Sequence, residues 1–272
     1  MMNEITNILK VNKVRKEFGG VVALYDVSFN VARGEIFAVI GPNGAGKTTL
    51  FNLISGALPV TAGEVYFNGR LLTGLRPDQI AALGLVRTFQ TVQVFGNMTV
   101  LENVMVGRHT KTHYSMLDAA LRLPIARSEE RRARADAMER LALVGLEQRA
   151  NDSAASLSFG QQRVLEAARA LAVDPELIML DEPGAGLTRS EVEELNRSIQ
   201  QLHARGVTVV LVEHNMELVM GIADRIIVLD YGQKIAEGTP LQVQQDERVI
   251  SAYLGAEVFT AVPAEEMNAP GK

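Results

Sequence analysis

The run GPNGAGKT at residues 41–48 constrains the fold more than any other part of the chain. It follows the apolar run IFAVI at 36–40, which predicts a buried parallel strand, and precedes the periodic run 49–54, which predicts a helix. A G-x-x-x-x-G-K-T loop in this context is typical of a phosphate-binding P-loop, because its glycines let consecutive N–H groups point inward at the positive end of the helix dipole. Lys47 would reach the β- and γ-phosphates, and the Thr48 hydroxyl would ligate Mg²⁺. The alternative is a chance glycine-rich turn, and the flanking patterns argue against it.

The composition excludes several classes of protein. With 272 residues and a net charge of −5, the chain has room for one large domain or two modest ones, and it carries no electrostatic footprint for nucleic acid. It contains no cysteine, which rules out a disulfide framework and agrees with a reducing cytosol. Residues 1–6 lack a signal-peptide pattern, and no apolar run approaches the roughly 18–20 residues that cross a bilayer. We therefore expect any work at a membrane to go through partners.

Short strands are predicted in the first third of the chain. The runs that carry strand patterns, the first two with antiparallel alternation, lie at residues 8–14, 27–31, 63–69 and 84–90. The last run ends in Gln90. Phe18 falls in the turn between the first two strands, where its ring could stack on a nucleobase, and a core position is the alternative.

Helical periodicity without strand patterns covers residues 99–145 and predicts an inserted helical subdomain. The basic cluster at 128–134 has interleaved acids and no aromatic residues, so a solvated helix face is favoured over nucleic-acid or lipid binding. Further on, Ser158 and Gln161 have the spacing of a capping box, ahead of the alanine- and leucine-rich helix expected at 164–171.

Two buried strands end in polar side chains. The strand expected at 177–180 is followed by Asp181 and Glu182. Because burying a carboxylate is costly, we expect this pair to face a metal ion or water at the carboxyl edge of a parallel sheet. The strand at 207–212 is followed closely by His214. A lone histidine is more often structural, and this position alone does not decide its role.

Taken in order, these motifs resemble those of the nucleotide-binding subunits of ABC transporters. The matching segments are the Walker A loop at 41–48, the Q-loop glutamine Gln90, the signature segment at 157–161, Walker B with its glutamate at 177–182, and the switch histidine His214. The resemblance implies an α/β fold of the P-loop NTPase (ABC ATPase) class. Such a fold has a RecA-like mixed-sheet core, an antiparallel β subdomain and an inserted α-helical subdomain.

The resemblance also implies a domain organisation. One ABC ATPase domain would span residues 1–255. Residues 1–90 and 166–255 would form the core and the antiparallel β subdomain, and 91–165 the helical and signature subdomain. We expect the last helical segment to end at Leu254 and residues 256–272 to form a flexible tail.

The family implies a head-to-tail dimer, formed with itself or with a related ATPase, in which ATP and Mg²⁺ lie between the P-loop of one subunit and the signature helix of the other. The implied catalytic residues are Glu182, His214, Gln90 and Lys47, and the implied metal residues are Thr48, Gln90 and Asp181. The implied nucleotide-binding residues are Phe18, Gly41, Pro42, Asn43, Gly44, Ala45, Gly46, Lys47, Thr48, Thr49, Ser158, Gly160 and Gln161. The chain departs from the family pattern at Phe159, where the common signature has a second glycine, and at Thr188, where many members have an aspartate. Both departures bear on the geometry between subunits.

A narrower resemblance is to the larger ATPase subunit of bacterial branched-chain amino-acid importers, with lipopolysaccharide-export and urea-import ATPases as close relatives. It rests on FGG at 18–20, RTFQ at 87–90, the long excursion at 109–124, EHNM at 213–216 and AYLG at 252–255. It implies an ATPase on the cytoplasmic face of the inner membrane that energises uptake of branched-chain or related amino acids. The implied partners are two permease subunits and, indirectly, a substrate-binding protein, with no nucleic acid. The sequence does not name the cargo, because no residue of such a subunit touches it.

Hypotheses from other classes stay open. A soluble ABC-type ATPase acting on ribosomes or DNA usually carries two ATPase units or a long coiled-coil insertion, and neither occurs here. A P-loop kinase would need an acceptor site and a GTPase a guanine motif such as N-K-x-D, and the sequence has no such motif. A non-hydrolysing structural subunit is disfavoured, because Lys47, Asp181, Glu182 and His214 are all present.

Overall fold

The computed structural model describes residues 7–88, 94–108 and 124–260. Its elements, in chain order, are β1 (Asn7–Phe18), β2 (Val21–Ala32), β3 (Ile36–Ile40), α1 (Lys47–Ile54), β4 (Ala62–Phe67), β5 (Arg70–Leu71), α2 (Pro77–Ala82), β6 (Leu85–Arg87), α3 (Val100–Arg108), α5 (Pro124–Leu143), the 3₁₀ turns η2 (Glu147–Arg149) and η3 (Ala154–Ser156), α6 (Phe159–Leu171), β7 (Leu177–Asp181), α7 (Arg189–Ala204), β8 (Thr208–Val212), α8 (Met216–Ile222), β9 (Arg225–Asp230), β10 (Gln233–Gly238), α9 (Pro240–Gln244) and α10 (Glu247–Thr260).

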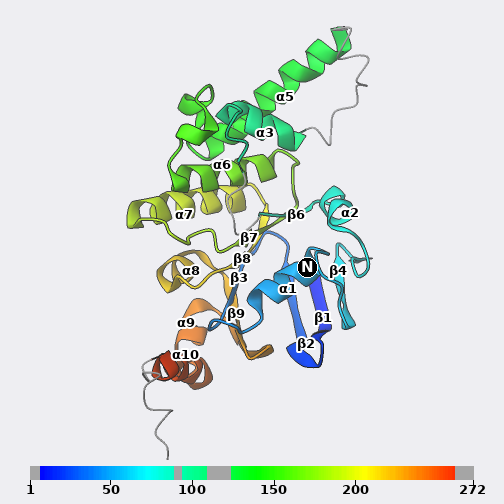
Figure 1. The fold of residues 1–272 in the computed structure, drawn as a ribbon, viewed down its shortest axis with the longest axis vertical. Helices are drawn as coiled ribbons and strands as arrows, with labels where there is room; N and C mark the ends of the chain where they lie inside the picture. Colours follow the sequence, from blue (N-terminus) through cyan, green and yellow to red (C-terminus); the bar gives the residue numbers. More distant parts are fainter. Residues whose placement is uncertain (1–6, 89–93, 109–123, 261–272) are drawn as a thin grey trace, which may run out of the picture.

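Two sheets form the body of the molecule (Figure 1). The larger sheet has the order β10-β9-β3-β8-β7-β6, and its strands run parallel except for β10 at the edge. Strands β3, β7 and β8 are buried along their whole length, as parallel strands covered on both faces should be. The smaller sheet, β2-β1-β4-β5, is antiparallel. The predicted fold class is therefore confirmed, and β1 and β2 are longer than expected.

Helix α1 packs between the two sheets. Its Leu50, Phe51 and Ile54 are fully buried in one hydrophobic cluster, together with Leu9 of β1 and Val39 of β3. The helix that begins at the P-loop is therefore held on both sides by close apolar packing, which leaves it little room to shift.

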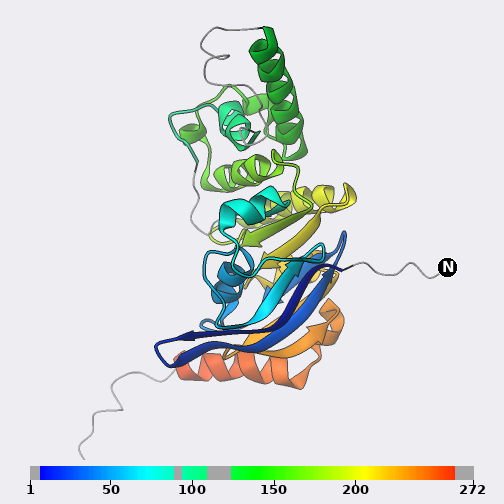
Figure 2. The same ribbon diagram turned by 90° about the vertical axis from the view of Figure 1, so that its right-hand side faces the viewer.

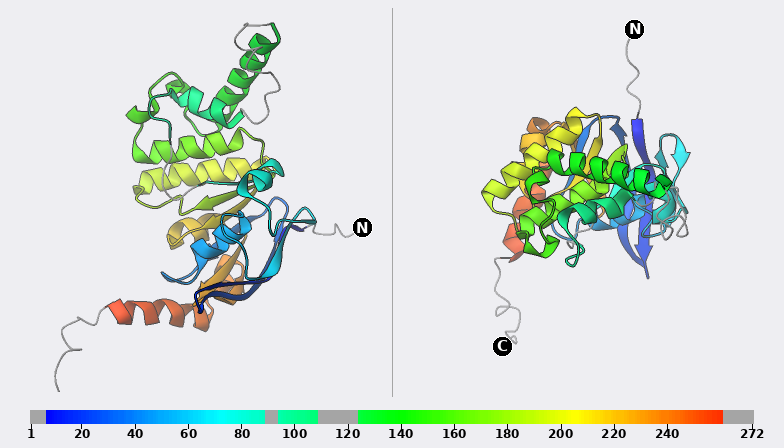
Figure 3. Two further views of the ribbon diagram at one scale, coloured as in Figure 1. Left: turned by 45° about the vertical axis from the view of Figure 1, so that its right-hand side comes forward. Right: turned by 90° about the horizontal axis from the view of Figure 1, so that it is seen from above.

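The opposite face of the larger sheet is covered by helices α7 to α10. Along α7 the buried side chains are Val192, Leu195, Ile199 and Leu202, a three-to-four spacing that places one apolar stripe against the sheet. Outward-facing residues of α7 are polar. This helix also lies beside α6, which connects the sheet layer to the remaining helices (Figures 1 and 3).

Helices α3, α5 and α6 form a lobe at the end of the molecule opposite α10 (Figures 2 and 3). The lobe has its own hydrophobic cluster, which includes Val104 of α3, Leu141 of α5 and Leu165 of α6 and continues to Ala172. The helical structure predicted for residues 99–145 is confirmed for α3 and α5. Most of the excursion expected at 109–124 lies outside the described residues. The subdomain boundaries at 90/91 and 165/166 stay a prediction. None of the helices within the described ranges is long and apolar enough to cross a membrane.

The predicted helix end at Leu254 is wrong, because α10 continues to Thr260. A glycine inside a helix costs only about 1 kcal/mol relative to alanine, so Gly255 does not stop a helix whose preceding turn is anchored. Tyr253 supplies such an anchor by packing against the cluster under the larger sheet. The rest of the expected tail, residues 261–272, lies outside the described residues.

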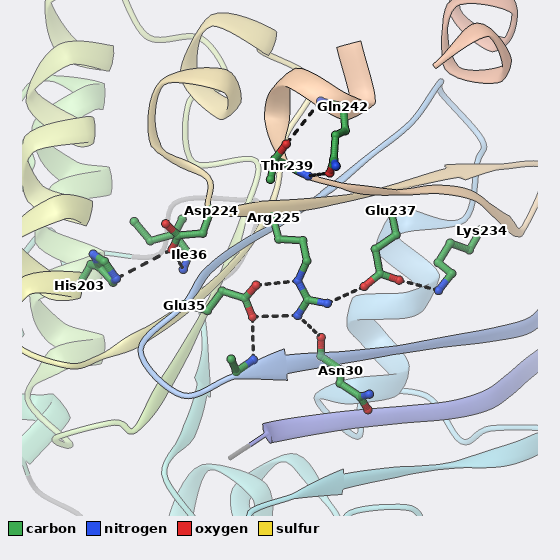
Figure 4. Close-up of polar contacts among 11 residues, drawn as sticks. Asn30, Glu35, Ile36, His203, Asp224, Arg225, Lys234, Glu237, Thr239 and Gln242 are labelled. Carbon is green, nitrogen blue, oxygen red and sulfur yellow. Dashed lines mark hydrogen bonds and ion pairs between the residues drawn. The ribbon is translucent and has the colours of Figure 1, made fainter. Parts of the chain in front are cut away.

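Arg225, at the start of β9, joins the two sheets through a polar network (Figure 4). Its Nε and Nη2 donate to the carboxylate of Glu35 at 2.7 and 3.0 Å, and Nη1 donates to Glu237 at 2.6 Å. Nη2 also donates to the backbone carbonyl of Asn30 on β2 at 2.7 Å. The bonds to Glu35 are the largest cause of the raised pKa of Arg225. The network therefore fixes the smaller sheet against the amino end of β3, opposite the P-loop.

Replacing Arg225 by alanine should destabilise the protein by about 2 kcal/mol, because it leaves the largely buried Glu35 carboxylate without its cation. For a chain of this size we expect the midpoint of thermal unfolding to fall by roughly 4–8 °C. Arg248→Ala is the matched control, since Arg248 forms an equally short ion pair with Asp246 at an exposed position. Equal melting temperatures for the two variants would contradict the structural role of the network.

Candidate functional site

Residues 41–46 form a tight loop between β3 and α1, in the strand–loop–helix context expected from the sequence. Gly41 has a φ of 152°, and a Cβ atom on it would lie 2.1 Å from the backbone oxygen of Leu229 on β9. Only glycine fits there. The loop backbone is thus pressed against the end of a neighbouring strand, and the amino end of α1 opens directly after it.

Lys47 is buried, with 7% of its surface exposed, at the first position of α1. Its Nζ donates to the backbone oxygens of Gly41 and Pro42, at 2.7 and 2.9 Å. Burial lowers the pKa of Lys47, and the negative charge of Glu182 opposes that shift. The ammonium group is therefore held over the loop by two neutral carbonyl acceptors. A phosphate would accept a stronger hydrogen bond from it than these carbonyls do, because the phosphate is charged.

A cleft of about 500 Å³ lies over this loop. It is lined by Val21, Val22, Ala23, Asn43, Gly44, Ala45, Gly46, Lys47, Thr48, Thr49, Glu182 and Tyr231. The start of β2, the P-loop and the end of β7 therefore meet in one concave site. None of the described residues that line this cleft comes from α6, so Ser158, Gly160 and Gln161 are not brought to it within the chain.

Phe18 lies at the end of β1, paired across the turn with Val21 at the mouth of the cleft. The ring is 45% exposed, and the Nζ of Lys16 lies 4.9 Å from its centroid. The core position considered for Phe18 is therefore not observed. One face of the ring is supported by a cation, and its role toward a nucleobase stays a prediction.

Asp181 and Glu182 follow one another at the end of β7, as expected. Asp181 is 1% exposed, and its Oδ2 forms an ion pair with Nη2 of Arg87 at 2.6 Å. Its Oδ1 is buried and has no hydrogen-bond partner within the described part of the chain. Glu182 adopts a left-handed φ of 47°, which turns the chain away from the strand and leaves Glu182 on the wall of the cleft.

The residues present fit a magnesium ion. The unpartnered Oδ1 of Asp181 is a hard oxygen ligand. The exposed Thr48, in the first turn of α1, lines the cleft over the P-loop. Mg²⁺ is usually held by one or two carboxylates together with substrate phosphates and water, so a large cluster of acids is not needed. Gln90, the other expected metal residue, lies outside the described residues.

Arg87 is part of this site through its ion pair with Asp181, and the sequence motifs did not predict that role. Arg87 ends β6, beside β7 in the sheet. Its Nη1 donates to Oδ1 of Asn52 in α1 at 2.7 Å and to Oγ of Ser55, at the end of that helix, at 3.0 Å. One guanidinium therefore connects Asp181 to α1. A basic residue at the end of a short strand was the available indication.

The signature segment begins α6, and the capping box predicted there is confirmed. Ser158 Oγ accepts from the backbone N–H of Gln161 at 3.2 Å, and Gln161 Oε1 accepts from the backbone N–H of Ser158 at 3.2 Å. Gln161 Oε1 also accepts from Arg149 at 2.9 Å, so its side chain is engaged within its own subunit. Phe159 is 50% exposed, with Arg163 beside its ring. Thr188, the other departure from the family pattern, caps α7, which is a role that threonine shares with aspartate.

Glu213 is a second residue whose role the sequence did not reveal. It lies between β8 and the exposed His214 and is fully buried. Its Oε1 accepts from the N–H of Gly184 at 2.5 Å, and its Oε2 accepts from the N–H groups of His214 and Asn215 at 3.0 and 3.1 Å. One buried carboxylate thus fixes the loop after Glu182 and the turn that carries His214 to each other. An acid directly after the apolar run 207–212 was the only indication.

Glu213→Gln should separate catalysis from nucleotide binding. The amide keeps the shape but can accept at only one of the two oxygen positions, so at least one of the backbone contacts is lost. We expect kcat for ATP to fall roughly 10- to 100-fold while KM for ATP stays near the wild-type value.

Glu217→Gln is the control for this variant, because Glu217 is exposed on α8 and pairs only with Arg189 among the described residues. Steady-state ATPase assays with active-site counting by ATP binding would make the comparison. Unchanged kcat in Glu213→Gln would contradict a positioning role.

A P-loop between β3 and α1 that lines a cleft, with paired carboxylates at the end of β7 in the same sheet, defines a P-loop nucleoside triphosphatase. Residues 24–185 match the ABC transporter family, and residues 233–258 match the branched-chain amino acid ATP-binding cassette transporter family. The chain belongs to the ABC transporter family and is an ATPase of it, so the family predicted from the ordered motifs is confirmed.

The likeness to known proteins extends over most of the chain. The high-affinity branched-chain amino acid transport ATP-binding proteins LivG of Salmonella typhimurium and Escherichia coli are each 43% identical over 253 residues, which cover 91% of this chain and 98% of each relative. The corresponding protein BraF of Pseudomonas aeruginosa is 42% identical over 249 residues with the same coverage.

Solved structures agree with this assignment. The ADP conformation of MJ1267, an ATP-binding cassette of an ABC transporter, matches with a TM-score of 0.81 and 35% identity over 92% of this chain and 99% of that chain. A dimeric structure of MJ0796, a bacterial ABC transporter cassette, matches with a TM-score of 0.71 and 30% identity over 85% of this chain and 98% of that chain.

Proposed function

We propose that this chain is the ATP-binding and ATP-hydrolysing subunit of an importer that takes up branched-chain or related amino acids through partner permeases. The observation that carries the proposal is the 43% identity to LivG over nearly the full length of both chains. The match of residues 233–258 to the branched-chain amino acid cassette family supports it independently, because that segment lies outside the region shared with ABC transporters in general.

In this proposal the cleft over the P-loop binds ATP. The backbone N–H groups of residues 43–49 surround the phosphates, and Lys47 leaves its two carbonyl acceptors to contact the β- and γ-phosphates. Thr48, Gln90 and Asp181 would hold Mg²⁺, which would supply positive charge next to the phosphates. Phe18 stacks on the adenine, with its other face supported by Lys16.

Hydrolysis needs a positioned water and stabilisation of the leaving charge. Glu182, on the wall of the cleft, orients and polarises the attacking water. His214 contacts the γ-phosphate from the turn that Glu213 fixes to the loop after Glu182. The segments that carry Glu182 and His214 are therefore fixed to each other by one buried carboxylate.

The site is completed by a second ATPase subunit, identical or related. Ser158, Gly160 and Gln161 lie away from the cleft of their own chain, at the start of α6, where the helix dipole favours an anion. They would contact the ATP bound to the partner's P-loop. The dimeric state of the related cassette MJ0796 supports this arrangement.

A groove between the sheet core and the helical lobe offers a docking surface for a permease helix. It has a volume of about 550 Å³, and its lining includes Arg87, Val94, the partly exposed Phe95 and Val106, and Arg169. A lining that combines apolar side chains with Arg87, Glu166 and Arg169 suits a short amphipathic helix. Val94 and Phe95, which follow Gln90 closely in the chain, line this groove, and residues 91–93 lie outside the described residues. Docking here would place the chain on the cytoplasmic face of the inner membrane.

Two variants test the assignment of the site. Glu182→Gln should keep ATP binding and slow hydrolysis by roughly 100- to 10,000-fold, as loss of a general base does.

Lys47→Ala should weaken ATP binding itself by roughly 100-fold, because a charged contact to the phosphates is lost. Isothermal titration calorimetry and a phosphate-release assay measure both quantities. Normal turnover in Glu182→Gln, or normal affinity in Lys47→Ala, would overturn the corresponding role.

The transport assignment is tested by purifying tagged Glu182→Gln protein with ATP from its native membranes in mild detergent and identifying what accompanies it by mass spectrometry. We expect two related permeases, a second ATPase and an amino-acid-binding protein, and uptake of labelled leucine should depend on the wild-type chain. Lipopolysaccharide-export or urea-transport components in their place would move the assignment to another transporter. Ribosomes or DNA would overturn the transporter function and leave the ATPase.

A further inference from the structure

The side chain of Glu191 bridges the start of α7 and the start of α6. Its Oε2 accepts from the backbone N–H and the hydroxyl of Thr188, at 2.9 and 2.8 Å. Its Oε1 accepts from the hydroxyl of Ser158 at 3.3 Å. The same oxygen lies directly over Gly160, where a Cβ atom would approach it to 2.4 Å. The two helices lie one above the other, so this contact closes the gap between their amino ends (Figure 1).

The carboxylate of Glu191 is ionised. Hydrogen bonds from the backbone and hydroxyl of Thr188 are the largest causes of its lowered pKa, and Ser158 and the backbone of Gly160 add to them. A full negative charge therefore faces the amino end of a helix of 13 residues, where an anion is favoured.

Ser158 and Gly160 are the groups that, in the proposed function, contact the γ-phosphate of ATP held by the second subunit. The hydroxyl of Ser158 has one proton, and its oxygen already accepts from Gln161 in the capping box. It can donate that proton to Glu191 or to a phosphate, but not to both. Glu191 thus occupies the donors that the phosphate needs.

We propose that Glu191 is an internal anion that competes, for the hydroxyl of Ser158, with the γ-phosphate of the ATP bound to the second subunit. The inference rests on the proposed dimeric function. Before closure the signature serine is paired within its own chain, and closure transfers its hydrogen bond from the carboxylate to the phosphate. The competitor raises the ATP concentration needed for closure, and it leaves ATP binding to the P-loop of a single subunit unchanged.

Glu191→Gln separates this role from the support that Glu191 gives to α7. Glutamine satisfies a capping box as glutamate does, so the contact with Thr188 and the start of α7 are kept. The neutral amide is a weaker acceptor than the carboxylate and does not compete as an anion. The matched control is Glu193→Gln, which removes the same charge from an exposed position on the same helix.

The experiment uses the full chain in the Glu182→Gln background, where hydrolysis does not obscure binding. Sedimentation velocity at increasing Mg²⁺-ATP gives the midpoint for dimer formation, and calorimetry at a protein concentration below dimerisation gives the affinity of the single subunit. In Glu191→Gln we expect the dimerisation midpoint to fall roughly five-fold relative to Glu193→Gln. Single-subunit affinity and the melting temperature should match the control.

A midpoint that is unchanged, or that falls equally in Glu193→Gln, would overturn the competition while leaving the dimeric ATPase intact. A fall in the single-subunit affinity or melting temperature of Glu191→Gln, without the expected shift in the midpoint, would assign Glu191 a structural role only. Failure of the parent protein to form any ATP-dependent dimer would overturn the proposed dimeric function, and the competition with it.

Discussion

The contact between the P-loop backbone and the end of β9 is the constraint on which the rest of the site depends. Gly41 approaches the backbone of Leu229 so closely that no side chain fits between them, and α1 then starts in the space between two sheets. The loop is fixed in this way at the carboxyl edge of the sheet. The other residues predicted to act on the nucleotide lie at the carboxyl ends of strands in the same sheet. Asp181 and Glu182 do so on β7, and His214 follows β8.

Features within one segment could be predicted from the sequence, and contacts between segments could not. The P-loop, the buried strand before Asp181 and the cap at Ser158 each depend on a few consecutive residues, whose periodicity and turn chemistry are visible in the chain. The contacts of Arg87 with Asp181 and of Glu191 with Ser158 join residues far apart in sequence, which meet only after the sheet and the lobe have packed. The end of α10 was missed for a related reason, since packing of its first turns outweighs the local preference of a glycine.

Arg87 gives the groove and the nucleotide site a shared part. Arg87 lines the groove between core and lobe. The same guanidinium binds Asp181 and Asn52 of α1. In the proposed function, a docked helix that displaces Arg87 would therefore change the charge beside Asp181, the proposed metal ligand.

The lobe formed by α3, α5 and α6 has a hydrophobic cluster that shares no residue with the clusters on either face of the larger sheet. The lobe therefore has a core of its own, and Ala170 of α6 adds a contact with the cluster that contains β3. The lobe can act as a separate cooperative unit, with amide exchange faster than that of the buried strands. Substitutions in it can accumulate to suit different membrane partners without loss of the nucleotide fold, which gives a physical basis for one ATPase core serving many transporters.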